Sequence, residues 1–223
     1  MASPKKLARI KDLYERKLVR PEGTGKVLPL NRILQRPISF FPAEAGNVDF
    51  DLVEIGPGKG EFLLSLAAQF PDKKIVGLEI GAKRFNTLKT KLIHQNITNV
   101  SLIFGDARIP FHKHFKDESI EKCFVLFPDP WPRNRHRHMR LLQKEFLMVI
   151  CSKLKKGGEF TLATDVQEYA TWVCDNLSLI PGMNNVFGKG QIVSELPDLI
   201  PTHFKMKWTA LGRSSWCLRF RKV

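Results

Sequence analysis

Cysteine is scarce in this sequence. The chain has only four cysteines, and no two of them form a C-x-x-C pair; they are Cys123, Cys151, Cys174 and Cys217. Structural zinc sites and disulfide frameworks depend on characteristic cysteine spacings, so this pattern argues against both. We expect buried free thiols and no metal site.

Long hydrophobic runs are also missing. No stretch of the sequence approaches the roughly 20 apolar residues that span a bilayer. The first residues lack the apolar core of a secretory signal, since lysines and arginines crowd them. The sequence therefore predicts a cytoplasmic protein that does not associate with membranes.

Acidic residues are few relative to basic ones. The 36 lysines and arginines outnumber the 22 aspartates and glutamates, which gives a formal net charge of +14. Such an excess creates an electrostatic potential that attracts a polyanion. Nucleic acid is therefore the leading class of partner.

The 223 residues suit one sizeable domain with an extension. Residues 1–47 contain a basic cluster and a stretch interrupted by proline and glycine, which predict a basic arm and a linker. From residue 48 to residue 223, short apolar runs alternate with helical patterns. Predicted strands cover residues 51–55, 75–79, 100–104, 122–127, 159–163 and 215–221, and predicted helices cover residues 61–69, 82–95, 141–154 and 167–177. Strands separated by helices predict an α/β fold of the Rossmann-like type, with a doubly wound, mostly parallel sheet and an antiparallel C-terminal strand.

A glycine-rich turn follows the first strand of this domain. The segment Glu54-Ile-Gly56-Pro-Gly58-Lys-Gly60 lies where glycines allow a tight turn and a close approach of a ligand to the backbone. A dinucleotide fingerprint requires G-x-G-x-x-G, but here Glu61 stands where the third glycine is expected, at the helix start that would bind a pyrophosphate. Glu54 and Glu61 instead suit a cofactor with a cationic amine and sulfonium, which is what S-adenosylmethionine offers.

Two further acids end the next two predicted strands. Glu79 closes the second strand, where an acid typically accepts hydrogen bonds from ribose hydroxyls. Asp106 follows the third strand and is placed to accept from an adenine amino group. Any one of these acids could be a strand-end or helix-capping residue, but with Glu54 and the glycine turn they predict one cofactor crevice.

The most specific segment of the chain follows the fourth predicted strand and reads Phe127-Pro-Asp-Pro-Trp-Pro. Its prolines remove backbone donors and stiffen the loop, which holds Asp129 and Trp131 beside the crevice. A basic run suited to phosphates and bases comes next, with Arg133, Arg135, His136, Arg137, His138 and Arg140. A solvated basic turn would have the same charge, and His-x-His could suggest a metal, but neither explains the prolines.

These motifs resemble those of the tRNA (guanine-N7)-methyltransferase family, from about Leu52 to the C-terminus. The resemblance is carried by the proline-rich loop with its Arg/His run, the turn at residues 54–60, Gly77-Leu-Glu79, Thr164-Asp165-x-x-x-Tyr169 and Thr202-x-Phe204. It implies a class I methyltransferase fold, S-adenosylmethionine as cofactor and tRNA as partner. The reaction it implies is methyl transfer to N7 of the variable-loop guanosine at position 46.

The resemblance also implies a role for individual residues. The cofactor would be held by Glu54, Gly56, Gly58, Gly60, Glu79 and Asp106, and Asp129 would lie at the active site. The substrate would be contacted by Arg133, which stands where the family usually has lysine, and by Asp165 and Thr202. The RNA would be contacted by Arg135, His136, Arg137, His138 and Arg140.

Lys205 departs from the family pattern, which usually has glutamate three residues after the motif threonine. A cation at this substrate site would oppose the positive charge of the product, so we expect Lys205 to turn toward RNA phosphate. Asp129 and Asp165 would then bind the base. Two alternatives stay open at this point: a catalytically weakened RNA-binding protein, for which Lys205 is the strongest argument, and a small-molecule methyltransferase. The sequence is compatible with a monomer or a homodimer.

Overall fold

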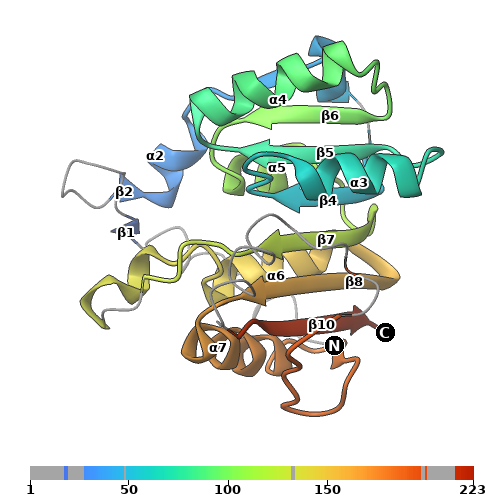
Figure 1. The fold of residues 1–223 in the computed structure, drawn as a ribbon. Helices are drawn as coiled ribbons and strands as arrows, with labels where there is room; N and C mark the ends of the chain where they lie inside the picture. Colours follow the sequence, from blue (N-terminus) through green and yellow to red (C-terminus); the bar gives the residue numbers. More distant parts are fainter. Residues whose placement is uncertain (1–17, 20–27, 48, 132–133, 197–198, 200–213) are drawn as a thin grey trace.

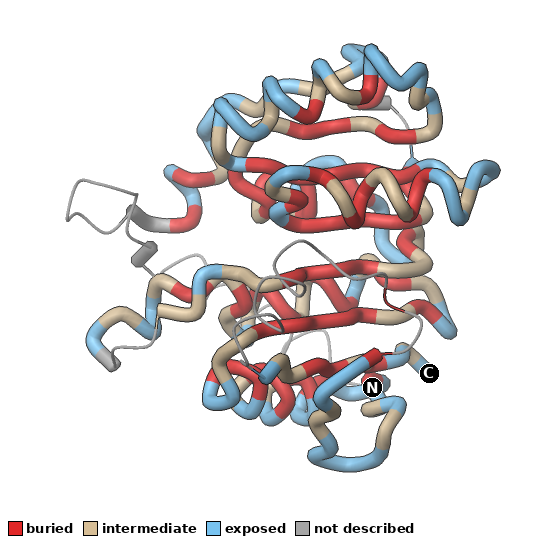
Figure 2. Tube along the Cα trace, viewed as in Figure 1, coloured by how far each residue is buried: buried red, intermediate tan, exposed pale blue. Residues whose placement is uncertain are grey.

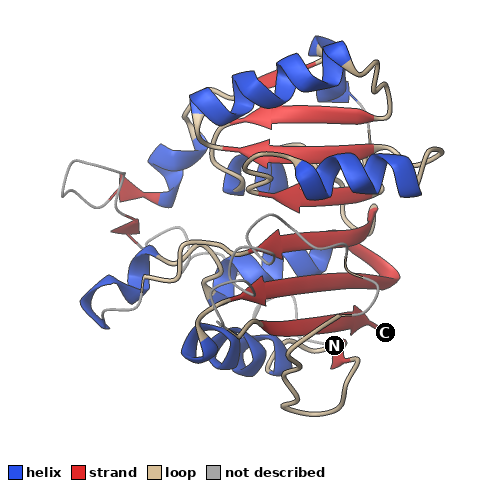
Figure 3. Ribbon diagram, in the orientation of Figure 1, coloured by secondary structure: helices blue, strands red, loops and turns tan. Residues whose placement is uncertain are grey.

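The structure is a computed structural model that describes residues 18–19, 28–47, 49–131, 134–196, 199 and 214–223. It contains a two-stranded ribbon and an eight-stranded sheet with helices on both faces (Figures 1 and 3). The ribbon consists of β1 (Leu18–Val19) and β2 (Leu28–Pro29). The sheet consists of β3 (Ser39–Phe41), β4 (Leu52–Ile55), β5 (Ile75–Glu79), β6 (Val100–Phe104), β7 (Ile120–Leu126), β8 (Leu154–Thr164), β9 (Met183–Asn185) and β10 (Trp216–Lys222). The described helices are α2 (Leu30–Leu34), η1 (Ala43–Asn47), α3 (Glu61–Gln69), α4 (Ala82–His94), α5 (Arg108–Lys113), η2 (Asn134–Met139), α6 (Lys144–Lys153) and α7 (Gln167–Ser178).

The strand order of the large sheet is β3-β6-β5-β4-β7-β8-β10-β9. The five central strands, from β6 to β8, are parallel, whereas β3, β10 and β9 each pair antiparallel with a neighbour. The chain leaves β4 toward β5 and later returns to its other side as β7, so the order reverses at β4. Open α/β sheets bind ligands at the carboxyl ends of the strands beside such a reversal. The predicted doubly wound sheet with an antiparallel C-terminal strand is confirmed.

The central strands consist mostly of buried residues (Figure 2), and the buried apolar side chains form two clusters, one on each face of the sheet. On one face, the apolar sides of α3 and α4 pack against residues such as Leu52 and Leu102. On the other face, α5, α6 and α7 pack against residues such as Val53 and Val125. The central strands are buried on both faces, because successive side chains of a strand point in opposite directions.

The segment that the sequence predicted to be a linker contributes to this domain. Strand β3 extends the sheet beside β6, and Leu30, Ile33 and Ala45 are buried. Helix α2 lies beside the carboxyl ends of the parallel strands, as does the segment that contains η2 (Figure 1). Sequence patterns missed α2 and β3 because both are short and flanked by proline.

Strand β8 is longer than the predicted strand at residues 159–163. It begins at Leu154, directly after α6, and its first half contains Lys155, Lys156 and two glycines at 157–158. These residues give no alternation of apolar and polar side chains, so only the apolar second half was recognised. The four cysteines are all buried and free, as expected. None of the described helices is long and apolar enough to span a bilayer.

Candidate active site

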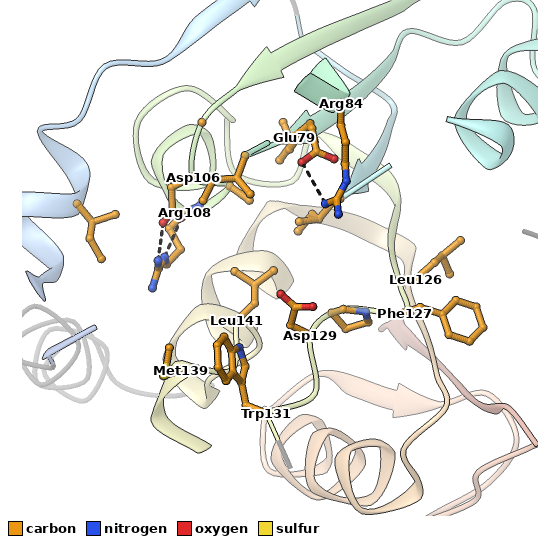
Figure 4. A pocket seen from close by; sticks show the side chains of 18 of the residues that line it. Glu79, Arg84, Asp106, Arg108, Leu126, Phe127, Asp129, Trp131, Met139 and Leu141 are labelled. Atoms are coloured by element: carbon orange, nitrogen blue, oxygen red, sulfur yellow. Dashed lines mark hydrogen bonds and ion pairs between the residues drawn. The ribbon is translucent and has the colours of Figure 1, made fainter. Parts of the chain in front are cut away.

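The carboxyl ends of β4, β5, β6 and β7 open into one pocket (Figure 4). Three of the acids selected from the sequence, Glu79, Asp106 and Asp129, line it together. The side chains of Glu79 and Asp106 lie on one side, and the Asp129 carboxylate points into the pocket from the other (Figure 4). The apolar part of the wall is formed by Ile33, Ile55, Leu78, Ile80, Ala107, Leu126, Phe127, Pro128, Trp131, Met139 and Leu141. The pocket therefore combines carboxylates with an apolar surface, as expected for an adenosine-containing ligand.

The glycine turn has a backbone that only glycine adopts readily, and of its three glycines Gly56 lines the pocket, whereas Gly58 and Gly60 are not among the lining residues. Gly56 and Gly60 have φ values of 76° and 81°. A Cβ on Gly60 would lie 2.0 Å from Leu88 Cδ2, so this glycine lets the turn pack against α4. A Cβ on Gly56 would have nothing within 4 Å among the described atoms, and Gly56 lines the pocket. The turn thus leaves the backbone at Gly56 open to a ligand.

Glu79 is buried and holds this turn in place. Its Oε2 accepts a hydrogen bond from the Gly58 N–H at 3.2 Å, and its Oε1 accepts one from the Gly81 N–H at 2.7 Å. The Arg84 guanidinium lies 3.9 Å from Oε1. Each carboxylate oxygen has lone pairs for more than one donor, so ribose hydroxyls can bind to Glu79 without displacing the backbone contacts.

Replacement of Glu79 by alanine is expected to weaken S-adenosylmethionine binding by roughly 1–3 kcal/mol, because ribose donors would lose their acceptor. Calorimetric titration measures this change. Glu79→Gln is the matched control: it keeps one acceptor oxygen and should lose less affinity than the alanine variant. A wild-type dissociation constant for Glu79→Ala would disprove the assignment.

Glu54 lies near the carboxyl end of β4, two residues before the pocket-lining Gly56, and is not itself among the described residues that line the pocket. It is buried, and its Oε2 has no hydrogen-bond partner among the described residues. Burial, followed by the charges of Glu61 and Glu79, raises the pKa of Glu54 to about 8. Because this buried carboxyl group has no described partner and lies near two carboxylates, a cationic donor would stabilise its ionised form. The protonated amine of S-adenosylmethionine would be such a donor.

Asp106 is held by Arg108 at the start of α5. Its Oδ1 accepts from the backbone N–H of Arg108 at 3.0 Å and from Nε at 2.8 Å, and Arg108 Nη2 pairs with Oδ2. Burial alone would raise the pKa of Asp106, but the hydrogen bonds and charge of Arg108, together with Arg36, lower it. The carboxylate is therefore ionised at neutral pH. An adenine amino group would donate to the same Asp106 carboxylate that Arg108 already contacts.

The proline-rich loop after β7 has an unusual backbone. Phe127 and Trp131 have φ values of 52° and 41°, a conformation that bulky residues rarely adopt. The Phe127 N–H donates to the Ala163 carbonyl at 2.7 Å, which ties the start of the loop to β8. Asp129, between these two residues, is exposed and faces the pocket. A strained loop that presents an acid to a pocket suggests a functional constraint.

The basic run after this loop divides into exposed and buried residues. Arg135, Arg137 and His138 are exposed on η2, whereas His136 is half-buried with its ring centroid 5.9 Å from that of Trp131. Arg140 was expected to contact RNA, but its side chain is 0% exposed and faces α7 instead of the surface. Local sequence could not show this burial, because the aromatic residues around Arg140 come from α7. The described residues contain no group of three His, Cys, Asp or Glu side chains that could hold a metal ion.

Four of the predicted substrate residues remain to be placed. Arg133, Thr202 and Lys205 are outside the described residues. Asp165 follows β8 and is half-buried; neither it nor Glu54 is among the described residues that line the pocket.

Three arginines line the pocket although the sequence analysis did not select them. They are Arg36, Arg84 and Arg108. Arg108 had a recognisable signal, because it is two residues after Asp106 at a helix start. Arg36 and Arg84 had none, since their proximity to the pocket depends on the placement of α2 and α4.

The chain is similar in sequence to known methyltransferases. Residues 49–218 match a family model described as "Putative methyltransferase". A tRNA (guanine-N(7)-)-methyltransferase of Pseudomonas syringae pv. syringae is 35% identical over 185 residues, which cover 79% of this chain and 76% of the relative. One from Pseudomonas fluorescens is 31% identical over 196 residues, covering 84% and 81%.

Solved structures show the same fold at low sequence identity. A SAM dependent methyltransferase from Aquifex aeolicus has a TM-score of 0.54 and 15% identity, with 97% of this chain and 98% of that chain covered. Precorrin-6y C5,15-methyltransferase from Geobacter metallireducens also has a TM-score of 0.54, with 14% identity and 78% and 80% covered. The fold is that of class I S-adenosylmethionine-dependent methyltransferases. The sequence matches go further than the fold, and the chain belongs to the tRNA (guanine-N(7)-)-methyltransferase family.

Proposed function

We propose that this chain is a cytoplasmic enzyme that transfers the methyl group of S-adenosylmethionine to N7 of guanosine 46 in the variable loop of tRNA. The observation that carries the proposal is the pocket at the carboxyl ends of β4 to β7. It combines two acids suited to an adenosine, Glu79 and Asp106, with Asp129 on the opposite side. The names of the similar Pseudomonas proteins support guanine N7 of tRNA as the target.

The cofactor would be held by residues of three successive strand ends. Glu79 would accept hydrogen bonds from the ribose hydroxyls, Asp106 from the adenine amino group, and Glu54 from the amine of the methionine part. Gly56 would let the cofactor approach the backbone. Bound S-adenosylmethionine supplies an electrophilic methyl group on a sulfonium. The buried apolar side chains that line the pocket, such as Leu78 and Leu126, would exclude water from this methyl group.

Asp129 would bind the base and stabilise charge. Guanine N7 has a lone pair and no proton, so Asp129 does not have to act as a general base. Methylation makes the purine cationic, and a fixed carboxylate near the ring stabilises that charge electrostatically. Asp129 would also accept from the guanine N1–H and amino group, which adenine does not present in this arrangement. Asp165 is the second candidate for this contact.

Incubation with methyl-labelled S-adenosylmethionine and unmodified tRNA tests the proposal directly. Nucleoside analysis of the product should give 7-methylguanosine, and cleavage of the RNA at the modified base should map it to position 46. A substitution of guanosine 46 in the tRNA should remove the product. Labelling of a different nucleoside, or no labelling despite cofactor binding, would refute the proposal.

The affinity for tRNA should fall steeply with salt, because each phosphate neutralised adds about 0.7–0.9 to the slope of log K against log salt. Arg135 and Arg137 are exposed beside the pocket, so replacing both by alanine should reduce that slope by about two. The slope is measured by filter binding from low to moderate salt.

A charge-matched control comes from the opposite end of the sheet. Lys74 and Lys156 are exposed near the amino ends of β5 and β8, and their double alanine variant removes the same charge. Its slope should stay close to that of the wild type. Equal changes in both double variants would show that the salt dependence reflects net charge rather than these arginines.

A further inference from the structure

The Arg140 guanidinium is buried between the proline-rich loop and helix α7. Its Nε donates to the Pro130 carbonyl at 2.8 Å, and its Nη2 lies 3.5 Å from the Trp131 carbonyl. On its other side, Nη1 and Nη2 donate to the Glu168 carboxylate at 3.3 Å and 2.6 Å. One side chain therefore connects the two residues that follow Asp129 to α7.

Aromatic rings of α7 fix the plane of this guanidinium. Arg140 Cζ lies 4.9 Å from the centroid of the Tyr169 ring and 5.4 Å from that of Trp172. The two rings are themselves stacked, with centroids 5.9 Å apart. A planar cation against aromatic faces has little rotational freedom, so its donors keep a fixed direction.

The loop needs such support because it cannot form its own hydrogen-bond ladder. Pro128 and Pro130 have no N–H, and the positive φ values of Phe127 and Trp131 take the backbone out of the β region. The carbonyls of Pro130 and Trp131 are thus left to a donor from elsewhere. Arginine can reach both carbonyls and a carboxylate at once, since it has five N–H donors in a rigid fork.

Stability alone does not account for a buried charge at this position. Burial of the guanidinium costs desolvation energy, and apolar side chains of similar volume often stabilise a protein as well as a buried charge or better. The contacts of Arg140 converge instead on the backbone that aims Asp129 into the pocket.

We infer that Arg140 is a positioning residue for methyl transfer, which holds the loop so that Asp129 meets the guanine in the correct orientation. The inference rests on the proposed function for its catalytic consequence. A displacement of about 1 Å at a reacting group can reduce a rate by about 100-fold. Arg140 therefore acts on the turnover number and leaves the binding of both substrates nearly unchanged.

The central variant is Arg140→Lys, which keeps a buried cation for Glu168 but lacks the fork that reaches both carbonyls. Its kcat should fall at least tenfold, while the dissociation constants of S-adenosylmethionine and tRNA stay within about threefold of the wild type. Arg140→Met, which has no donors, should lose more activity. Arg221→Lys is the matched control, because Arg221 pairs with the Glu159 carboxylate at 2.7 Å and neither residue lines the pocket. It should leave kcat and both dissociation constants close to those of the wild type.

A second measurement follows the loop without any reaction. Hydrogen exchange of peptides covering the backbone N–H groups of Phe127 and Trp131 should be faster in Arg140→Lys than in Arg221→Lys. Faster exchange with an unchanged kcat would overturn the positioning role, as would a loss of kcat matched by an equal loss of cofactor affinity. If the wild type forms no 7-methylguanosine, the proposed function fails, and the exchange result alone decides whether Arg140 holds the loop. If Arg140→Met does not fold, the kcat and the hydrogen exchange of Arg140→Lys test the positioning role.

Discussion

Asp129→Asn is expected to lower kcat for guanine methylation by about 100-fold or more, because the variant removes the negative charge that faces the developing purine cation. The change keeps the shape of the side chain, so loss of packing does not contribute. Asp129 lies across the pocket from Glu79 and Asp106 (Figure 4), and S-adenosylmethionine should therefore bind with an affinity within about threefold of the wild-type value. Single-turnover methylation and calorimetric titration measure the two quantities.

Asp165→Asn is the control for a general loss of negative charge near the site. Asp165 follows the neighbouring strand β8 and is half-buried. If Asp129 is the main electrostatic group, the Asp165 variant loses less activity than the Asp129 variant. A turnover in Asp129→Asn equal to that of the wild type would remove Asp129 from the mechanism, and a larger loss in Asp165→Asn would transfer the role to Asp165.

The sequence predicted the parallel core well because each of its elements has a local signature. Strands such as β5 and β6 are short, largely apolar runs between helices, and their predicted bounds are those observed. The glycine turn and the acids at the strand ends were recognisable for the same reason. A parallel α/β sheet brings the carboxyl ends of its strands to one edge, so order along the chain predicted proximity in space.

What depended on contacts between distant segments was not predicted. Helix α2 brings Ile33 and Arg36 into the pocket wall from a segment interpreted as a linker. Arg140 resembles its exposed neighbours in the sequence, and only α7, with Glu168 and Tyr169, makes it a buried residue. Charge patterns report the composition of a segment, whereas burial of a charge is decided by the partners that the fold provides.

The proposed role of Glu54 in cofactor binding requires a buried negative charge, which lowers the stability of the fold. In the native protein, burial is the main cause that raises the pKa of Glu54 to about 8, so this side chain keeps its proton until the pH approaches 8. An exposed glutamate releases its proton near pH 4.5. Between these two pH values the native state binds more protons than the unfolded state, so stability falls as pH rises through this window. Above pH 8 the cost of the buried charge is complete, and it is on the order of 3–5 kcal/mol from the size of the shift.

Glu54→Gln should therefore stabilise the protein in the absence of cofactor at pH 8.5, by about 5–15 °C in Tm for a chain of this size. At pH 5 the same variant should melt within about 3 °C of the wild type, because Glu54 is already protonated there. Glu61→Gln is the control: it removes one neighbouring charge at the start of α3 but not the burial, which is the larger cause. Its effect at pH 8.5 should be smaller than that of Glu54→Gln.

The same substitution should weaken the binding of S-adenosylmethionine, because the cationic amine stabilises the ionised form of Glu54. Binding at pH 7 should release about one proton from the wild type, since the protonated carboxyl must ionise, and almost none from Glu54→Gln. Calorimetry in buffers of different ionisation enthalpy counts these protons. Cofactor binding without proton release would disprove the contact between Glu54 and the amine. A Glu54→Gln variant no more stable than the wild type at pH 8.5 would disprove the cost of burying this charge. A stabler variant with weaker cofactor binding would show that the buried carboxylate is kept for its ligand and at the expense of the fold.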